Sequence, residues 1–147
     1  MTEQKEIAEI QQKINAAETD FERSAWQTKL AWHYAERDQW ISAGHEFHKA
    51  SAIALAASES DQNAKLVAAQ LCRLEGLAWA NGENHRPEAM RALEQSLLLY
   101  ESLADAEAMA DVQTHLDSLA GSGWQEQQLS DSLDDALNNI LHVSGEL

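Results

Sequence analysis

The chain has 147 residues, of which 44% are apolar and 24% charged, with a formal net charge of −15. This length and apolar content suffice for one buried core and exclude disorder through most of the chain. The chain has 25 acidic and 10 basic residues, and this excess of negative charge repels phosphate backbones and anionic membrane surfaces. We therefore expect no nucleic-acid partner. Six Gly and one Pro make up roughly 5% of the residues, against about 12% in average usage. Few and short loops, and hence a mostly helical chain, are predicted.

No export signal or transmembrane segment is expected. Residues 1–6 carry acid where a signal peptide has a basic region. The longest uninterrupted apolar run, Ala52–Ala57, has six residues, against the roughly 20 that span a bilayer. The single cysteine, Cys72, cannot form an intrachain disulfide and lies in an apolar stretch, which favours packing over reactivity. We therefore expect a cytoplasmic protein.

Apolar residues recur at steps of three and four, which is typical of amphipathic helices. The first helix is predicted over residues 2–17. Thr19 and Glu22 have the spacing of a capping box and open a second helix, which runs to about residue 37. A third helix is predicted over 40–57. The buried stripes of these helices contain Ile7, Ile10, Ile14, Trp26, Leu30, Tyr34, Ala43, Phe47, Ala50 and Ala54.

Four more helices follow the same pattern. The fourth should stop near Gly82, and Pro87 suits the first turn of the fifth, where its missing N–H costs nothing. The sixth ends at Gly121, and Ser122 with Gln125 forms a second capping box that opens the seventh. No strand is predicted, so the fold class is all-α, with about seven helices in a single domain, 1–147. The stripes contain Val67, Leu71, Leu74, Ala78, Ala89, Leu93, Leu97, Tyr100, Met109, Val112, Leu116, Leu119, Leu129, Leu133, Leu137 and Ile140.

Short turns force neighbouring helices to pair antiparallel, in a bundle or a solenoid. An internal repeat favours the solenoid. Ala43 and Ala89 each begin the same small-x-x-x-large step and are 46 residues apart, while Leu30 and Leu74 are 44 apart. Two successive helix pairs therefore repeat with nearly one period.

The first pair resembles the tetratricopeptide repeat (TPR), with its pattern W-x2-L-G-x2-Y followed by A-x3-F. Gln27 stands where the repeat has Trp, and in the second pair Glu75 stands where it has a small residue. The resemblance implies a TPR-like antiparallel solenoid of three helix pairs, 19–57, 61–103 and 104–142, with 1–17 as an extra N-terminal helix. The matching positions are Leu30, Ala31, Tyr34, Trp40, Ala43, Phe47 and Ala50, then Leu74, Ala78, Gly82, Ala89 and Leu93.

A repeat of about 45 residues, rather than 34, resembles the longer repeats of kinesin light chains. The resemblance implies a non-enzymatic protein–protein interaction adaptor or scaffold that associates with a cytoskeletal, tubulin-like filament. An alternative is a TPR regulator that senses a peptide or small molecule, or a chaperone-like protein. The isoleucine stripe of the first helix can cap this chain or pair with another copy, so a homo-oligomer stays open.

In TPR proteins the first helix of each pair lines a concave groove that holds an extended peptide or a partner's helix. The resemblance places Trp32 and Trp79 in this groove, where aromatic residues anchor interfaces. Both tryptophans can equally be core residues. The Lys and Asn that grip a chaperone's C-terminal carboxylate are absent, because their places hold Thr28 and Trp32. The partner-binding candidates are Thr28, Trp32, Gln39, Gly76, Trp79 and Glu83.

Charge is unevenly distributed. All ten Lys and Arg lie at or before Arg91, whereas residues 92–147 contain eleven acids and no Lys or Arg. Such a run is commonly a solvated helix face. It can also steer a basic partner surface into contact.

The sequence carries no recognisable catalytic, metal or cofactor site. His45 and His48 lie three apart on a predicted helix, a spacing that can bring two imidazoles to one metal, but no HExxH motif or Cys pair accompanies them. No glycine-rich phosphate loop is present, and no local signature marks Cys72 as a nucleophile. We therefore expect no enzyme, no metal and no cofactor.

Overall fold

The computed structural model describes residues 2–59, 61–82, 84–121, 124 and 129–144. Within these residues it contains seven α-helices and no β-strand, which confirms the predicted all-α class. No helix among them is both long enough and apolar enough to cross a membrane. The helices are α1 (Thr2–Ala16), α2 (Asp20–Ala35), α3 (Trp40–Ala57), α4 (Gln62–Asn81), α5 (Arg86–Ser102), α6 (Ala106–Ala120) and α7 (Ser130–Ser144).

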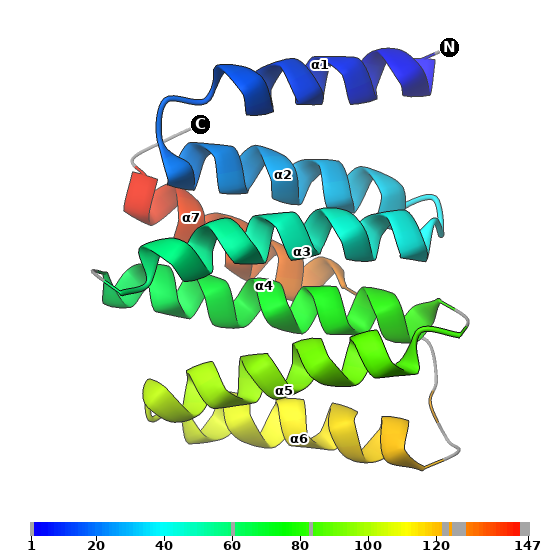
Figure 1. The fold of residues 1–147 in the computed structure, drawn as a ribbon, viewed down its shortest axis with the longest axis vertical. Helices are drawn as coiled ribbons and strands as arrows, with labels where there is room; N and C mark the ends of the chain where they lie inside the picture. The colour runs from blue at the N-terminus through cyan, green and yellow to red at the C-terminus, as the bar shows by residue number, and fades with distance from the viewer. Residues whose placement is uncertain (1, 60, 83, 122–123, 125–128, 145–147) are drawn as a thin grey trace.

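The first six helices stack in chain order, each packed against the one before it. Figure 1 shows this row running from α1 at one end to α6 at the other. The connections inside the row span only three or four residues, so consecutive helices have to lie next to each other. The row is the part of the predicted architecture that the structure shows.

The seventh helix leaves the row. It lies across one side of the stack and makes its main contacts with α4 and α2. The sequence predicted α6 and α7 as a third antiparallel pair, whereas the structure places α7 on helices of the first two pairs. Apolar periodicity identifies the stripe that a helix buries but not the neighbour that covers it, which explains the difference.

Small residues let the stacked helices approach closely. Ala31 of α2 and Ala43 of α3 are fully buried, and Phe47 is among the largest fully buried side chains. A Cβ atom on Gly76 of α4 would lie 2.6 Å from Cγ of Leu93 on α5, so only glycine allows this approach. The core is thus built from alternating small and large residues between successive helices.

The predicted cap at Thr19 is confirmed. Its Oγ1 accepts a hydrogen bond from the backbone N–H of Glu22 at 3.0 Å, while the Glu22 carboxylate accepts from the N–H of Glu18 rather than from Thr19 itself. Pro87 is the second residue of α5, as predicted. The second predicted capping box lies outside the described residues.

Helix α1 closes the α2 end of the row. Ile14 of its isoleucine stripe is 8% exposed. The Glu6 carboxylate lies 3.5 Å from Nδ1 of His33 on α2 and 3.5 Å from Nη2 of Arg37 in the turn that follows α2. An apolar stripe flanked by ionisable contacts therefore holds α1 in place.

Candidate functional site

The three groove candidates of the first pair lie in different environments. Thr28 is fully buried in α2, where its Oγ1 donates a hydrogen bond to the carbonyl of Ser24. Trp32 is half-buried and packs against the core. Gln39 is exposed and lies in the turn before α3, beside a surface hollow. Of these three, Trp32 and Gln39 retain accessible surface for a partner.

The candidates of the second pair lie at helix contacts. Gly76 faces Leu93 of α5, as described above. Trp79 is 4% exposed and packs on Gly44 of α3, where an added Cβ would lie 2.6 Å from the indole ring. Glu83 lies outside the described residues. The structure therefore does not bring the five described candidates together on one surface.

Helix α4 is the centre of the molecule. It packs against α3, α5 and α7, and twelve of its twenty residues are buried. Two features lie on it. One is the surface of α2 and α4 that α7 covers, which we call the α7 seat. The other is a pocket between α3, α4 and α5, which we call the Glu75 pocket.

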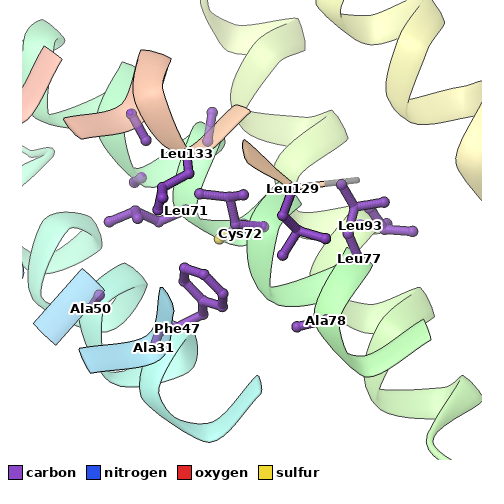
Figure 2. Close-up of a cluster of buried hydrophobic side chains, with 14 of the residues drawn as sticks. Ala31, Phe47, Ala50, Leu71, Cys72, Leu77, Ala78, Leu93, Leu129 and Leu133 are labelled. Atoms are coloured by element: carbon purple, nitrogen blue, oxygen red, sulfur yellow. The ribbon is translucent and has the colours of Figure 1, made fainter. Parts of the chain in front are cut away.

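The α7 seat holds an amphipathic helix. The α7 segment buries Leu129, Leu133, Ala136 and Ile140, which are 0 to 3% exposed and follow one another at steps of four, three and four residues. Figure 2 shows Leu133 reaching from α7 toward Leu71 of α4. The seat is thus an apolar surface of the shape and length that suit one helix.

A few polar contacts orient α7 on its seat. Asn139 Nδ2 donates a hydrogen bond to Oε1 of Gln70 on α4 at 3.0 Å. Ahead of the helix, the indole N–H of Trp124 donates to Oδ1 of Asn81 at 3.4 Å. Because a hydrogen bond needs a defined geometry, the bond between Asn139 and Gln70 favours one register of α7 among those that apolar packing alone would allow.

The Glu75 pocket has a buried carboxylate at its centre. Glu75 is only 3% exposed. Its oxygens accept hydrogen bonds from Nε1 of Trp79 at 3.0 Å and from Oγ of Ser51 at 3.3 Å, and they lie 3.2 and 3.3 Å from Nδ1 of His48. Burying a carboxylate is costly unless hydrogen bonds and an opposite charge compensate it. The one ionisable counterpart within 4.0 Å among the described residues is His48, whose side chain is 59% exposed.

The pocket has a volume of about 240 Å³. Glu75 lies among apolar walls, while His48, Arg91 and Gln95 add polar groups. A mostly apolar hollow with a few convergent polar groups is typical of a small-ligand site. Its lining residues are His48, Ser51, Ala52, Leu55, Cys72, Glu75, Arg91, Ala92 and Gln95.

Cys72 also lines this pocket but is poorly suited to act as a nucleophile. Burial, and secondarily the nearby Glu75 charge, raise the pKa of its thiol to about 12. The thiol therefore stays protonated near neutral pH, and the thiolate is the reactive form. Its side chain is 3% exposed and packs in the core.

A second, more polar pocket of about 210 Å³ surrounds Arg73 on the other side of α4. Arg73 Nη2 lies 3.4 Å from Nε2 of His115, and its Nε is buried with no hydrogen-bond partner among the described residues. Burial, followed by the Arg73 charge, lowers the pKa of His115, while burial raises the pKa of Tyr100 to about 12. The carboxylates of Asp111 and Asp135 line the same pocket.

The histidine pair with metal-ligand spacing does not converge. His48 turns toward Glu75, whereas the ring of His45 meets the indole of Trp79 edge-on with centroids 4.9 Å apart. Across the described ranges, no group of three or more His, Cys, Asp or Glu side chains could hold a metal ion.

Glu75 is the site residue that sequence reasoning did not select. In the sequence it is only a departure from the repeat, because an acid stands where a small residue is expected. An acidic residue inside an otherwise apolar helical segment, with Leu74 before it and Gly76 after it, was the available signal. Its partners His48 and Ser51 come from α3 and could be found only from the fold.

Comparison with known proteins gives no match. No protein-family model matches the chain, and neither a curated protein nor a solved structure does so. The TPR resemblance therefore rests on the residues given above.

Proposed function

We propose that this chain is a non-enzymatic protein–protein interaction module of the TPR type, which binds an amphipathic helix of its partner on the α7 seat. The single observation that supports this function best is the occupant of the seat. A helix of the same chain lies there, with four buried apolar side chains and a side-chain hydrogen bond from Asn139 to Gln70. Helix-in-groove recognition uses the same arrangement between two proteins.

The occupant also describes the partner. A partner helix that replaces α7 needs apolar residues at steps of four, three and four, with a small residue at the third position, where α7 has Ala136. Ala136 is fully buried, so a larger side chain there has no room without rearrangement. A polar side chain at the position of Asn139 would form a hydrogen bond with the side chain of Gln70.

Charge adds a second requirement. Residues 92–147 carry eleven acids and no Lys or Arg. A partner with a basic surface beside its apolar stripe would associate faster, and salt would slow this association. The kinesin-light-chain-like link to a tubulin-like filament stays a prediction, to be checked by cosedimentation with polymers from the same cell.

A second function, the sensing of a small molecule or peptide, is supported by a different observation. The Glu75 pocket combines a buried carboxylate with apolar walls, and it lies away from the α7 seat on the side of α4 between α3 and α5. The two functions use different surfaces, so one chain can have both.

The interaction function is tested by opening the seat. Leu133→Asp places a charge in the apolar contact and should release α7, whereas Asp134→Asn changes an exposed residue of the same helix. A fluorescent peptide of residues 129–144 should bind the Leu133→Asp chain in trans, as measured by anisotropy, and bind the Asp134→Asn and wild-type chains much more weakly. Circular dichroism verifies that each variant folds.

Absence of peptide binding to a folded Leu133→Asp chain would contradict the proposal, because the emptied seat would then not recognise a helix. If the seat does bind the peptide, the same variant becomes the bait for cell lysate. A partner captured by Leu133→Asp and displaced by the peptide would occupy the α7 seat.

A further inference from the structure

The Glu75 pocket contains one carboxyl group, on Glu75, and one guanidinium group, on Arg91, that are not paired with each other. Glu75 is nine-tenths buried, and its one ion-pair counterpart among the described residues is the half-exposed His48. Arg91 lines the same pocket from α5 and is exposed. No ion pair within 4.0 Å joins Arg91 to any residue in the described ranges. The pocket therefore presents two separated opposite charges.

The existing contacts leave the Glu75 carboxylate incompletely neutralised. Trp79 and Ser51 donate hydrogen bonds but carry no charge. The Ser51 hydroxyl has a single proton, which it also directs at the carbonyl of His48 at 2.9 Å. Three groups, on Trp79, Ser51 and His48, lie within hydrogen-bond distance of Glu75, and a carboxylate can accept about four hydrogen bonds, so Glu75 has capacity for one further donor.

The walls between the two charges are apolar. Ala52 and Leu55 come from α3 and Ala92 from α5. A volume of about 240 Å³ is smaller than the roughly 300 to 1,000 Å³ of pockets for drug-sized ligands. These features suit a short alkyl chain with a charged group at each end.

We propose that the Glu75 pocket binds a small zwitterion, in which a primary ammonium group pairs with Glu75, a short alkyl chain lies against Ala52, Leu55 and Ala92, and an anionic group pairs with Arg91. A simple cation fits less well, because Arg91 repels it. A simple anion would meet Glu75 uncompensated. This inference deepens the second function proposed above and does not depend on what binds the α7 seat.

Calorimetric titration of the full chain tests the charge pattern. The probes are 6-aminohexanoate, n-hexylamine and hexanoate, which share a chain length and differ only in their charged ends. We expect 6-aminohexanoate to bind at least tenfold more tightly than either of the others. The shorter 4-aminobutanoate and longer 8-aminooctanoate measure the separation of the two charges, and the best member of this series is the probe for the variants.

Variants of the two charged residues test their roles. Glu75→Gln keeps the shape and removes the charge; its single amide oxygen can still accept from Trp79, while its amide N–H can donate to Oγ of Ser51. It should weaken zwitterion binding at least tenfold. Arg91→Ala should do the same. Glu94→Gln and Arg86→Ala change exposed residues outside the pocket lining and should leave binding unchanged. If Glu75→Gln does not fold, Arg91→Ala and the three-probe comparison on wild type decide the question.

The proposal is overturned if no zwitterion of the series binds at millimolar concentration, if hexanoate or hexylamine binds as tightly as the zwitterion, or if folded Glu75→Gln binds like wild type. None of these outcomes affects the peptide test of the α7 seat. A C-terminal lysine of another protein has the same end groups, so the peptide Gly-Gly-Lys is compared with 6-aminohexanoate. Tighter binding of the peptide identifies a chain end as the source, and tighter binding of the free zwitterion identifies a small molecule.

Discussion

The indole of Trp79 lies directly against Gly44, so closely that a Cβ atom on Gly44 would be 2.6 Å from Cδ2 and 2.7 Å from Cε2 of the ring. Gly44→Ala should therefore destabilise the fold by about 1 to 3 kcal/mol, because a buried indole cannot shift without disturbing α3 and α4. Urea unfolding measures this loss. Gly121→Ala is the matched control, since its Cβ would meet nothing closer than 3.6 Å, and it should change the free energy of unfolding much less. An equal loss in both variants would contradict the packing shown here.

Ala104 ends α5 in a left-handed conformation, with φ of 58°. The N–H groups of Ala104 and Asp105 bond to the carbonyls of Glu101 and Tyr100, which forms a Schellman motif whose usual residue is glycine. Ala104→Gly should raise the free energy of unfolding by about 1 kcal/mol, because it removes the strain of a Cβ in this region. Ala110→Gly, within α6 and exposed, should lower it by a similar amount. Thermal melts show whether each variant raises or lowers the melting temperature. A lower melting temperature for Ala104→Gly would refute the prediction.

His115 makes stability depend on pH. Burial and the Arg73 charge lower its pKa in the folded state below the ordinary value of 6.5, so the unfolded chain takes up this proton first as pH falls. The histidine therefore costs no stability above about pH 6.5 and removes stability as pH falls from there through the lowered pKa. His115→Gln should flatten the pH dependence of the urea midpoint between about pH 7 and pH 5. An unchanged slope in His115→Gln would disprove the assignment.

Leu133 should hold α7 on its seat. Leu133→Ala removes a side chain that is 3% exposed and should weaken α7 docking by about 2 to 5 kcal/mol. Hydrogen exchange should then accelerate in residues 129–140 while the amides of α3 and α4 stay protected. Asp134→Ala changes an exposed side chain of α7 and should not alter hydrogen exchange. If α3 and α4 lose protection together with α7, the seat is an inseparable part of the core and not a surface with an occupant.

The sequence predicted all seven helices because each carries a local signal. The Ile7 and Ile10 stripe and the Thr19 cap are encoded within one or two helical turns, and so is Pro87. The seat of α7 is not encoded in this way. Which helix the stripe of Leu129 and Leu133 covers depends on contacts between residues far apart in the chain; Asn139 and Gln70, for example, are 69 positions apart.

The groove candidates on α4 show a second limit. The TPR resemblance implies a groove that contains Gly76 and Trp79, but α4 is covered by α3, α5 and α7. Residues around most of its circumference are buried, so its apolar pattern does not distinguish one face from another. Glu75 interrupts the apolar pattern of α4. Its contacts with His48 and Ser51 come from α3, so they cannot be predicted from the sequence of α4 alone.

The central position of α4 connects the molecule's two candidate sites. Glu75 and Gln70 lie on one helix five residues apart, one beside the pocket and the other bonded to α7. Thermodynamic linkage then imposes a symmetry: a ligand that binds the pocket more tightly when α7 is seated must strengthen α7's hold on its seat by the same factor. A ligand that favours the chain with α7 released must make the seat more available to another helix by an equal amount. The binding constant of a small molecule, measured with and without a helical peptide present, would thus report the coupling between the two sides of this single helix.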